Sequence, residues 1–200
     1  MKNLFFIAIA LSSLTLFSTT AVALETGVQA PNFTLNAFNV GPISLSDFVG
    51  KYVVLEWFNP YCPTGRKYYQ NNLMQQLQKD YVLKGIVWLT ISSTNKQNDD
   101  YIDDGRAKYL VKGKKMGSTY VLDDSEGIVG KLYNARTTPH IFIIDPKGRL
   151  IYQGAVDNDW DMFEKPTEEQ NFVRLVLDSA LSKKRVPVGH TPVYGCHIKY

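Results

Sequence analysis

Residues 52–69, YVVLEWFNPYCPTGRKYY, lead from a predicted buried strand through a turn into a predicted helix. The strand is indicated by the apolar run at residues 53–58, which only Glu56 interrupts, because strands covered on both faces are apolar almost throughout. After the turn at Asn59-Pro60, apolar residues recur at about every fourth position as far as Tyr81, the pattern of one face of an amphipathic helix. Cys62 therefore lies where the strand gives way to the helix.

The position of Cys62 favours a reactive thiolate. Unpaired backbone N–H groups and the positive end of the helix dipole favour an anion at the start of a helix, so we expect this thiol to ionise more readily than a free cysteine. A thiolate is a nucleophile, whereas the neutral thiol is not. The alternative is a buried and inert cysteine, because cysteine is common in protein cores.

The size and composition of the chain suit one domain. Its 200 residues are 44% hydrophobic and 20% charged, which is ordinary for a protein with one core. Residues 1–23 are predicted to be a secretory signal, with a positive start at Lys2, an apolar run and small residues before the expected cleavage after Ala23. An uncleaved membrane anchor is the alternative. We expect a domain at residues 25–183, a tail at 184–200, and a periplasmic or secreted protein without stable membrane association.

Charge and cysteine content restrict the partners. The net charge of +3 falls by one when Lys2 leaves with the signal, which is too little to indicate nucleic acid or an anionic membrane as a partner. Export brings Cys62 and Cys196, the two cysteines of the chain, into a compartment where disulfides persist.

The rest of the chain predicts alternating strands and helices. Short strands on either side of residues 39–41 predict an opening hairpin, and the apolar run Ile86–Ile91 predicts a second buried strand parallel to the first. Beyond it we expect a strand edge at Thr119–Leu122, a hairpin of His140–Asp145 with Arg149–Gln153, helices at Asp99–Lys112, Glu126–Tyr133 and Thr167–Ser182, the last opened by a capping box from Thr167 to Gln170, and a tail that lies extended on the body or free in solvent.

Three segments together resemble the thioredoxin-fold redoxins, which include the peroxiredoxins of the alkyl hydroperoxide reductase/thiol-specific antioxidant type and the periplasmic thiol-disulfide oxidoreductases. They are APNFTLNAFNVGPISLSDFVGK (30–51), VVLEWFNPYCPTGRK (53–67) and TTPHIFIIDPKG (137–148). Residues 194–200, YGCHIKY, are similar to the YGC-x-x-KY tail of peroxiredoxin-like redoxin-domain proteins. The resemblance implies an α/β, thioredoxin-like fold with a central mixed β-sheet flanked by helices, an N-terminal β-hairpin and an extended C-terminal tail.

The resemblance implies that Cys62 is the catalytic nucleophile. In the related oxidoreductases the motif is W-C-x-x-C, and here Gly65 stands at the second cysteine position. Cys62 therefore has no neighbouring thiol to resolve a mixed disulfide. Cys196 is the remaining candidate: it resolves an intermediate on Cys62, forms a permanent brace with it worth roughly 5 kcal/mol in the chain-entropy model, or stays free or pairs between molecules.

Other site residues also follow from the resemblance. Glu56 matches a buried acid that moves protons to and from the active-site thiols, and burial would raise its pKa; the alternative is a strand-end residue that faces water or forms an ion pair. Thr138, Pro139 and Pro63 are expected to form the substrate-binding face, with a cis bond before Pro139, although most X-Pro bonds are trans.

The peroxiredoxin motif P-x-x-x-T-x-x-C is not matched. Leu55 and Asn59 stand at its proline and threonine positions, and Pro139 stands where those enzymes have a peroxide-polarising arginine. Arg66 or Arg136 could substitute for it, or both are solvated surface charges.

The leading hypothesis is a thiol oxidoreductase that acts on a protein disulfide or a hydroperoxide, is reset by an external thiol reductant and needs no bound cofactor or metal. The alternative is a non-catalytic redoxin-like binding module or a copper carrier. The copper carriers of related fold use a C-x-x-x-C pair, which Arg66 breaks here, although Cys62, Cys196 and His197 could converge on a metal. His140 and His190 are more simply surface or packing residues.

Overall fold

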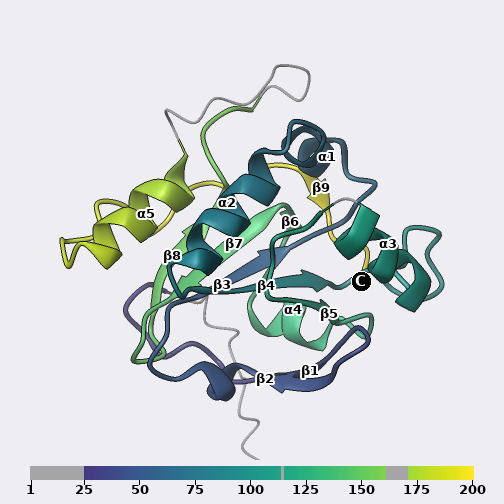
Figure 1. Cartoon of the computed structure of the whole chain (residues 1–200), viewed down its shortest axis with the longest axis horizontal. Coiled ribbons are helices and arrows are strands. Elements are labelled where there is room, and N and C mark those ends of the chain that lie inside the picture. The colour runs from purple at the N-terminus through teal and green to yellow at the C-terminus, as the bar shows by residue number, and fades with distance from the viewer. Residues whose placement is uncertain (1–24, 114, 161–170) are drawn as a thin grey trace, which may run out of the picture.

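A mixed sheet forms the centre of the molecule (Figure 1). The computed structural model describes residues 25–113, 115–160 and 171–200. The strands of this sheet are Thr34–Ala37 (β1), Gly41–Ser44 (β2), Val53–Trp57 (β3), Val87–Ser92 (β4), Tyr120–Asp123 (β5), His140–Ile144 (β7) and Leu150–Gly154 (β8). Their order is β2-β1-β5-β4-β3-β7-β8; β3, β4 and β5 run parallel, and β1 and β7 pair antiparallel to β5 and β3. The predicted fold class is confirmed, including the opening hairpin of β1 and β2.

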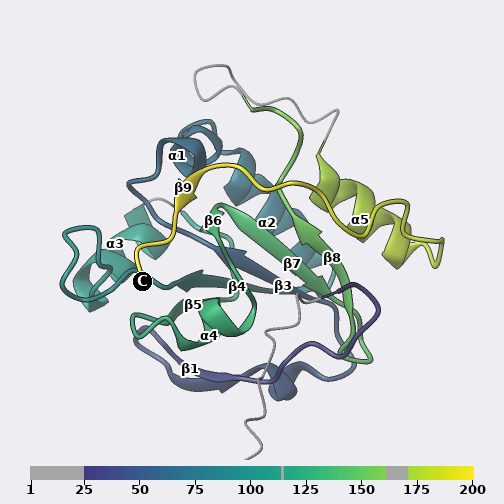
Figure 2. The ribbon, with the colours of Figure 1, turned by 180° about the vertical axis from the view of Figure 1, so that it is seen from behind.

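Helices cover both faces of the sheet. They are Leu45–Phe48 (a 3₁₀ turn), Pro63–Gln70 (α1), Leu73–Leu83 (α2), Asp104–Gly113 (α3), Ile128–Leu132 (α4) and Phe172–Leu181 (α5). Apolar side chains of α1, α2 and α5 pack on one face, and Val129 and Tyr133 of the α4 region pack on the other. Figure 1 shows α2 in front of the sheet, and Figure 2, from behind, shows α4 in front.

The central strand β3 supplies side chains to both layers. Because successive residues of a strand point to opposite faces, Leu55 and Trp57 pack with the α4 layer and Val54 packs with the α2 layer. All five residues of β3 are buried, as the apolar run predicted. Glu56 shares the parity of Val54, so its carboxylate is directed into the α2 layer.

Two predicted helices have different bounds in the structure. The helix expected to run unbroken from Cys62 to Tyr81 is two helices, because Asn72 adopts a left-handed conformation (φ 58°) that an α-helix cannot continue. The helix expected from Asp99 begins only at Asp104. At α5, Asn171 caps the first turn by accepting a hydrogen bond from the Arg174 N–H (3.0 Å); the capping box predicted at Thr167 lies outside the described residues.

The tail lies on the body of the protein. Cys196–His197 (β9) pairs antiparallel with Thr137–Thr138 (β6), a two-stranded ladder that the sequence did not predict. Figure 2 shows the tail passing from α5 across the end of the sheet beside β6 toward α4. The choice between a docked and a free tail is therefore decided in favour of docking.

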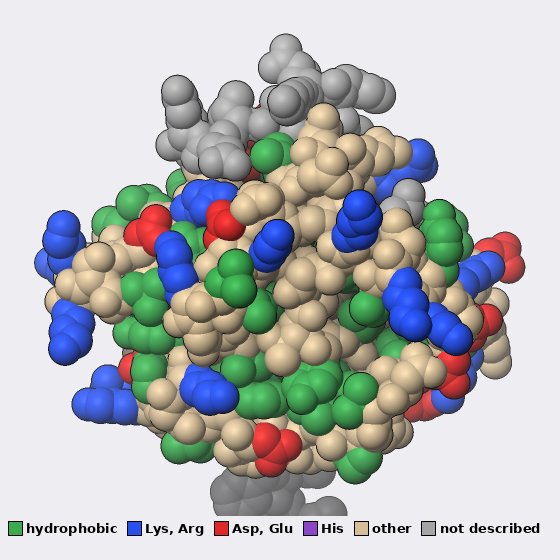
Figure 3. Space-filling view, viewed as in Figure 1, with side chains coloured by type: hydrophobic (Ala, Val, Ile, Leu, Met, Phe, Trp, Pro, Cys, Tyr) green, Lys and Arg blue, Asp and Glu red, His purple; other side chains and the backbone are tan. Residues whose placement is uncertain are grey.

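On the face drawn in Figure 3, Lys and Arg side chains are spread over the surface and are more prominent than Asp and Glu side chains, with apolar side chains between them. The predicted signal at residues 1–23 lies outside the described residues. Within the described ranges, no helix combines the length and apolar character that a membrane span requires.

Candidate active site

Cys62 is the N-cap residue of α1. Its backbone is extended (φ −69°, ψ 120°), Pro63 follows as the first helical residue, and the Cys62 carbonyl accepts the Arg66 N–H at 2.8 Å. Asn59 stabilises the preceding turn: its carbonyl accepts the Cys62 N–H at 3.2 Å and its side-chain oxygen accepts the Tyr61 N–H at 2.8 Å. The strand, turn and helix start predicted around Cys62 are confirmed.

Cys62 and Cys196 form a disulfide. Their Cα atoms are 5.7 Å apart, which is ordinary for a disulfide, although 134 positions separate them in the sequence. Cys196 is therefore not a free thiol in this oxidised form, one of the three alternatives predicted for it. A resolving thiol and a brace both remain compatible with the bond.

The disulfide lies against the residues predicted to bind substrate. Thr138 pairs with Cys196 in the β6–β9 ladder, and its carbonyl oxygen is 2.9 Å from the Cys62 sulfur. The bond between Thr138 and Pro139 is cis, as expected. Thr138 and Pro139 are buried and Pro63 is exposed, so the protein's own tail occupies the edge of the predicted substrate face.

The tail approaches β6 too closely for a side chain at Gly195. This residue has φ +127°, a conformation that favours glycine, and a Cβ there would collide with the Thr138 carbonyl. The Cys196 N–H donates toward the Cys62 sulfur at 3.4 Å. With the tail docked, Cys62 is 2% exposed.

Glu56 is buried in the α2 layer and is not an exposed strand-end residue. Its carboxylate accepts hydrogen bonds from Tyr69 Oη (2.7 Å), Trp88 Nε1 (2.7 Å), Gln78 Nε2 (2.8 Å) and Thr90 Oγ1 (3.3 Å). Loss of water on burial raises the pKa of Glu56, and the four donors oppose that rise because they stabilise the anion. None of these four donors is a thiol, so the structure brings Glu56 into a polar cluster in the α2 layer and not into a hydrogen bond with Cys62.

The three histidines differ in burial and do not form a metal-ligand cluster within the described ranges. Burial lowers the pKa of His140 to about 3, helped by the positive charges of Arg136 and His190. Its Nδ1 accepts the Arg136 N–H (3.3 Å), and its ring lies 4.4 Å from that of Phe142. His190 and His197 are exposed. No group of three or more His, Cys, Asp or Glu side chains in the described ranges could hold a metal ion, so the copper alternative finds no ligand set there.

The sequence did not identify the residues that fix the tail. The Tyr194 hydroxyl donates to the buried Asp157 carboxylate and lies 2.7 Å from the Tyr68 hydroxyl. The Tyr200 hydroxyl donates to the Ala135 carbonyl at 2.7 Å. The YGC-x-x-KY pattern contains both tyrosines and was the available signal.

These features define a class: a thiol oxidoreductase of thioredoxin-like fold, with a disulfide-bonded cysteine at a helix start beside a cis-proline. The model of the AhpC/TSA family matches residues 26–153, and the chain belongs to that family.

Known proteins agree with this assignment. The chain is 28% identical over 138 residues to the thioredoxin-like protein YneN of Bacillus subtilis, an alignment that covers 66% of this chain and 72% of that protein. It is 27% identical over 130 residues to the thiol-disulfide oxidoreductase ResA of Bacillus cereus (65% and 69%). A crystal structure of an uncharacterised conserved protein from Geobacillus kaustophilus has the same fold, with a TM-score of 0.75, 24% identity, and coverage of 88% of this chain and 93% of that one.

Proposed function

We propose that the protein is an exported thiol–disulfide oxidoreductase in which Cys62 is the nucleophile and Cys196 the resolving thiol. The observation that carries this proposal is the Cys62–Cys196 disulfide. It supplies from the tail the partner that the C-x-x-C motif lacks here at Gly65. Export rests on the predicted signal at residues 1–23.

The reaction is a pair of exchanges. In the reduced enzyme the Cys62 thiolate attacks a disulfide of a protein substrate, which forms a mixed disulfide and releases one substrate thiolate. The Cys196 thiolate then attacks the Cys62 sulfur, which forms the Cys62–Cys196 bond and releases the second substrate thiolate. An external thiol reductant returns both cysteines to the reduced state, and the opposite direction oxidises a substrate dithiol. No cofactor enters these steps.

The neighbouring residues have supporting roles in this proposal. The start of α1 stabilises the Cys62 thiolate through unpaired N–H groups and the helix dipole. Thr138, Pro139 and Pro63 border the sulfur and form the face that receives the substrate once the tail moves. Glu56 is proposed as the proton acceptor, supported by its burial and raised pKa. Because its four hydrogen-bond donors include no thiol, a relay group has to connect it to Cys62.

Disulfide exchange is favoured over peroxide reduction. Leu55 and Asn59 replace the activating proline and threonine of the peroxiredoxin motif, and Arg66 and Arg136 are both exposed. Attack on a disulfide needs no such polarising group, because the group that leaves is a thiolate, whose low basicity makes it a good leaving group.

The test compares wild type, Cys62→Ser and Cys196→Ser in insulin-disulfide reduction, hydroperoxide consumption and copper uptake. We expect insulin reduction by wild type, none by Cys62→Ser, and a persistent mixed disulfide on Cys62 in Cys196→Ser. Equal behaviour of the three proteins in both redox assays would remove the enzyme proposal. Copper uptake that either serine variant loses would favour the carrier alternative, and loss of hydroperoxide consumption alone would favour the peroxidase.

A further inference from the structure

The tail is fixed on both sides of Cys196 by contacts that do not involve sulfur. Before Cys196, the Tyr194 hydroxyl is hydrogen-bonded to the Asp157 carboxylate and to the Tyr68 hydroxyl. After it, the Ile198 N–H donates to the Arg136 carbonyl (3.1 Å), the Asn95 N–H donates to the Lys199 carbonyl (2.8 Å), and the Lys199 ammonium lies 2.6 Å from the Asp100 carboxylate. The tail therefore has its own affinity for the body.

Tyr200 occupies a notch that two glycines of the α4 region create. A Cβ at Gly130 would lie 2.5 Å from the Tyr200 hydroxyl oxygen, and a Cβ at Gly127 would lie 2.5 Å from the Tyr200 ring. The ring is further held by the bond from its hydroxyl to the Ala135 carbonyl and by the Lys131 ammonium, 5.4 Å from the ring centre. The Tyr200 ring fits in the notch because neither glycine has a side chain that would occupy the same space.

We propose that Tyr194 and Tyr200 are positioning residues that hold the Cys196 thiol beside Cys62 and thereby set how readily the disulfide forms. This inference rests on the proposed role of Cys196 as the resolving thiol. Between two thiols of one chain, the equilibrium for disulfide formation is governed by their effective concentration. If the segment after Leu181, the end of α5, were undocked, Cys196 would sample a large volume and this concentration would be low. The two tyrosines supply docking contacts that raise it.

The first test measures the equilibrium constant of the Cys62–Cys196 bond against a glutathione redox buffer, with the oxidised fraction read by alkylation and mass. Tyr200→Ala is expected to lower it at least tenfold, which corresponds to about 30 mV, and Tyr194→Phe and Tyr200→Phe are expected to lower it by smaller factors. Tyr120→Phe is the matched control, because no hydrogen bond of its hydroxyl is present among the described residues, and it should leave the constant unchanged.

Gly130→Ala provides a variant outside the tail. Alanine favours the helix itself, but its Cβ would also lie 2.9 Å from the hydroxyl oxygen of the buried Ser93, so urea unfolding of the reduced variant is measured alongside to separate a loss of body stability from a loss of tail docking. Its methyl group would displace the Tyr200 ring and lower the disulfide equilibrium constant. Because both changes act at one notch, Tyr200→Ala combined with Gly130→Ala should lower the constant no further than Tyr200→Ala alone.

Two results separate this inference from the proposed function. If Tyr200→Ala and Gly130→Ala leave the equilibrium constant within twofold of wild type while wild type reduces insulin, the positioning role is overturned and the function stands. If the constants fall as expected but Cys196→Ser turns over insulin like wild type, the positioning role stands as a property of the disulfide and the resolving role is overturned.

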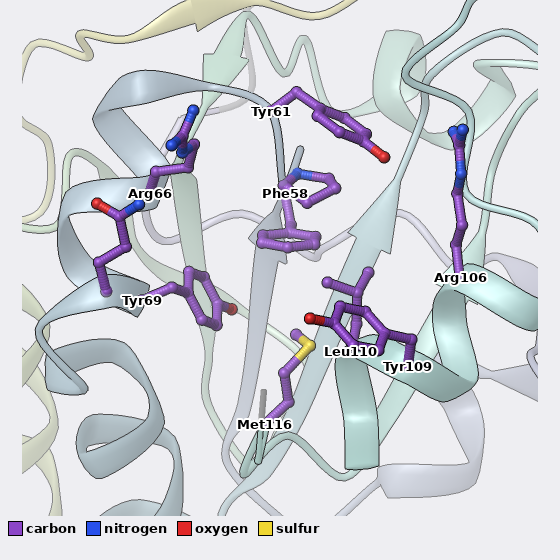
Figure 4. A pocket seen from close by; sticks show the side chains of 10 residues that line it. Phe58, Tyr61, Arg66, Tyr69, Arg106, Tyr109, Leu110 and Met116 are labelled. Atoms are coloured by element: carbon purple, nitrogen blue, oxygen red, sulfur yellow. The ribbon is translucent and has the colours of Figure 1, made fainter. Parts of the chain in front are cut away.

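A second inference concerns a hollow of about 410 Å³ on the other side of the active-site turn (Figure 4). Phe58, Leu110 and Met116 form a buried apolar floor, and Tyr61 and Tyr109 border it with exposed rings. Arg66 of α1 and Arg106 of α3 stand on opposite sides in Figure 4, and no acidic residue is among the described residues that line the hollow.

The geometry points to a ligand with an apolar body and one anionic group. The volume lies within the range of small-molecule sites. Arg106 is already held by the carbonyls of Asp99 and Tyr101 (both 2.7 Å), whereas the Arg66 guanidinium has no partner among the described residues. Such a ligand would place its anionic group on the Arg66 guanidinium and its apolar body over the ring of Phe58.

Octanoate and the neutral 1-octanol serve as probes in calorimetric titrations. We expect octanoate to bind at least tenfold more tightly than 1-octanol, and Arg66→Gln to remove this preference while Arg149→Gln, a distant exposed arginine, keeps it. Equal binding of the two probes, or an octanoate preference that survives in Arg66→Gln, would overturn the assignment. Neither result bears on the disulfide.

Discussion

Thr138 and Cys196 face each other in the β6–β9 ladder, so the residue before the cis-proline is paired with the residue that carries the second active-site sulfur. One short ladder thus joins the predicted substrate edge to the proposed resolving thiol. If substrate binds at the Thr138 edge as proposed, it competes there with the tail, and the proposed reaction then requires the two to exchange.

The first prediction concerns the ionisation of Cys62. In Cys196→Ser, the rate of alkylation of Cys62 should rise with pH around a midpoint below the usual thiol pKa of about 8.5, because the start of α1 stabilises the thiolate. Iodoacetamide kinetics between pH 5 and 10 measure this midpoint. A midpoint at or above that of glutathione would contradict a thiolate held by the helix.

The second prediction concerns Glu56. Because burial raises its pKa above 4.5, the folded protein holds this proton over a pH range in which the unfolded chain has lost it. Its contribution to stability is therefore present below about pH 4.5 and is lost as pH rises through the raised pKa. Urea unfolding of wild type and Glu56→Gln from pH 4 to 8 should show this loss in wild type alone, and parallel pH profiles would argue against a raised pKa.

The third prediction concerns His140, whose pKa is lowered to about 3. The neutral form in the fold contributes stability above the unfolded pKa of about 6.5, and this stability is lost as pH falls toward 3 at up to about 1.4 kcal/mol per pH unit. The difference in unfolding free energy between wild type and His140→Gln should therefore shrink between pH 6.5 and 4.5. A constant difference would contradict a buried neutral imidazole.

The fourth prediction concerns the start of α4. The buried Asp124 carboxylate accepts the N–H groups of Val129 (3.0 Å) and Gly130 (2.8 Å) and the Ser93 hydroxyl (2.5 Å). Asp124→Ala leaves these donors without a partner and should cost about 2–4 kcal/mol in urea unfolding. Glu126→Ala, which removes an exposed ion pair with Lys96 (3.9 Å), should change stability by less than about 0.5 kcal/mol and is the control.

The sequence predicted what local patterns encode. The apolar run of β3, the turn at Asn59-Pro60 and the helix start at Cys62 all appear, because strand and helix periodicities depend on neighbouring residues. The break between α1 and α2 was missed because the left-handed conformation of Asn72 interrupts an otherwise regular apolar repeat. Resemblance, not periodicity, supplied the cis bond before Pro139.

Contacts between distant segments could not be predicted in the same way. Three states of Cys196 were open because its pairing depends on where a proline- and glycine-rich tail docks. The tail can dock only because glycines leave room for it. Gly195 lies against Thr138, and Gly127 and Gly130 lie against Tyr200, where a side chain would collide. Similarly, the burial of Glu56 fits the apolar run, but its donors Tyr69, Gln78 and Trp88 come from separate elements.

The Cys62–Cys196 bond closes a covalent ring that contains β4 and β7, the two strands that flank β3 on either side. For a loop of this length the chain-entropy model assigns the closed ring roughly 5 kcal/mol over the open chain. Reduction should therefore shorten the lifetime of the folded protein toward proteases. The ratio of thiols to disulfides in its surroundings would then govern how much of the folded protein survives proteolysis, as well as its proposed redox state.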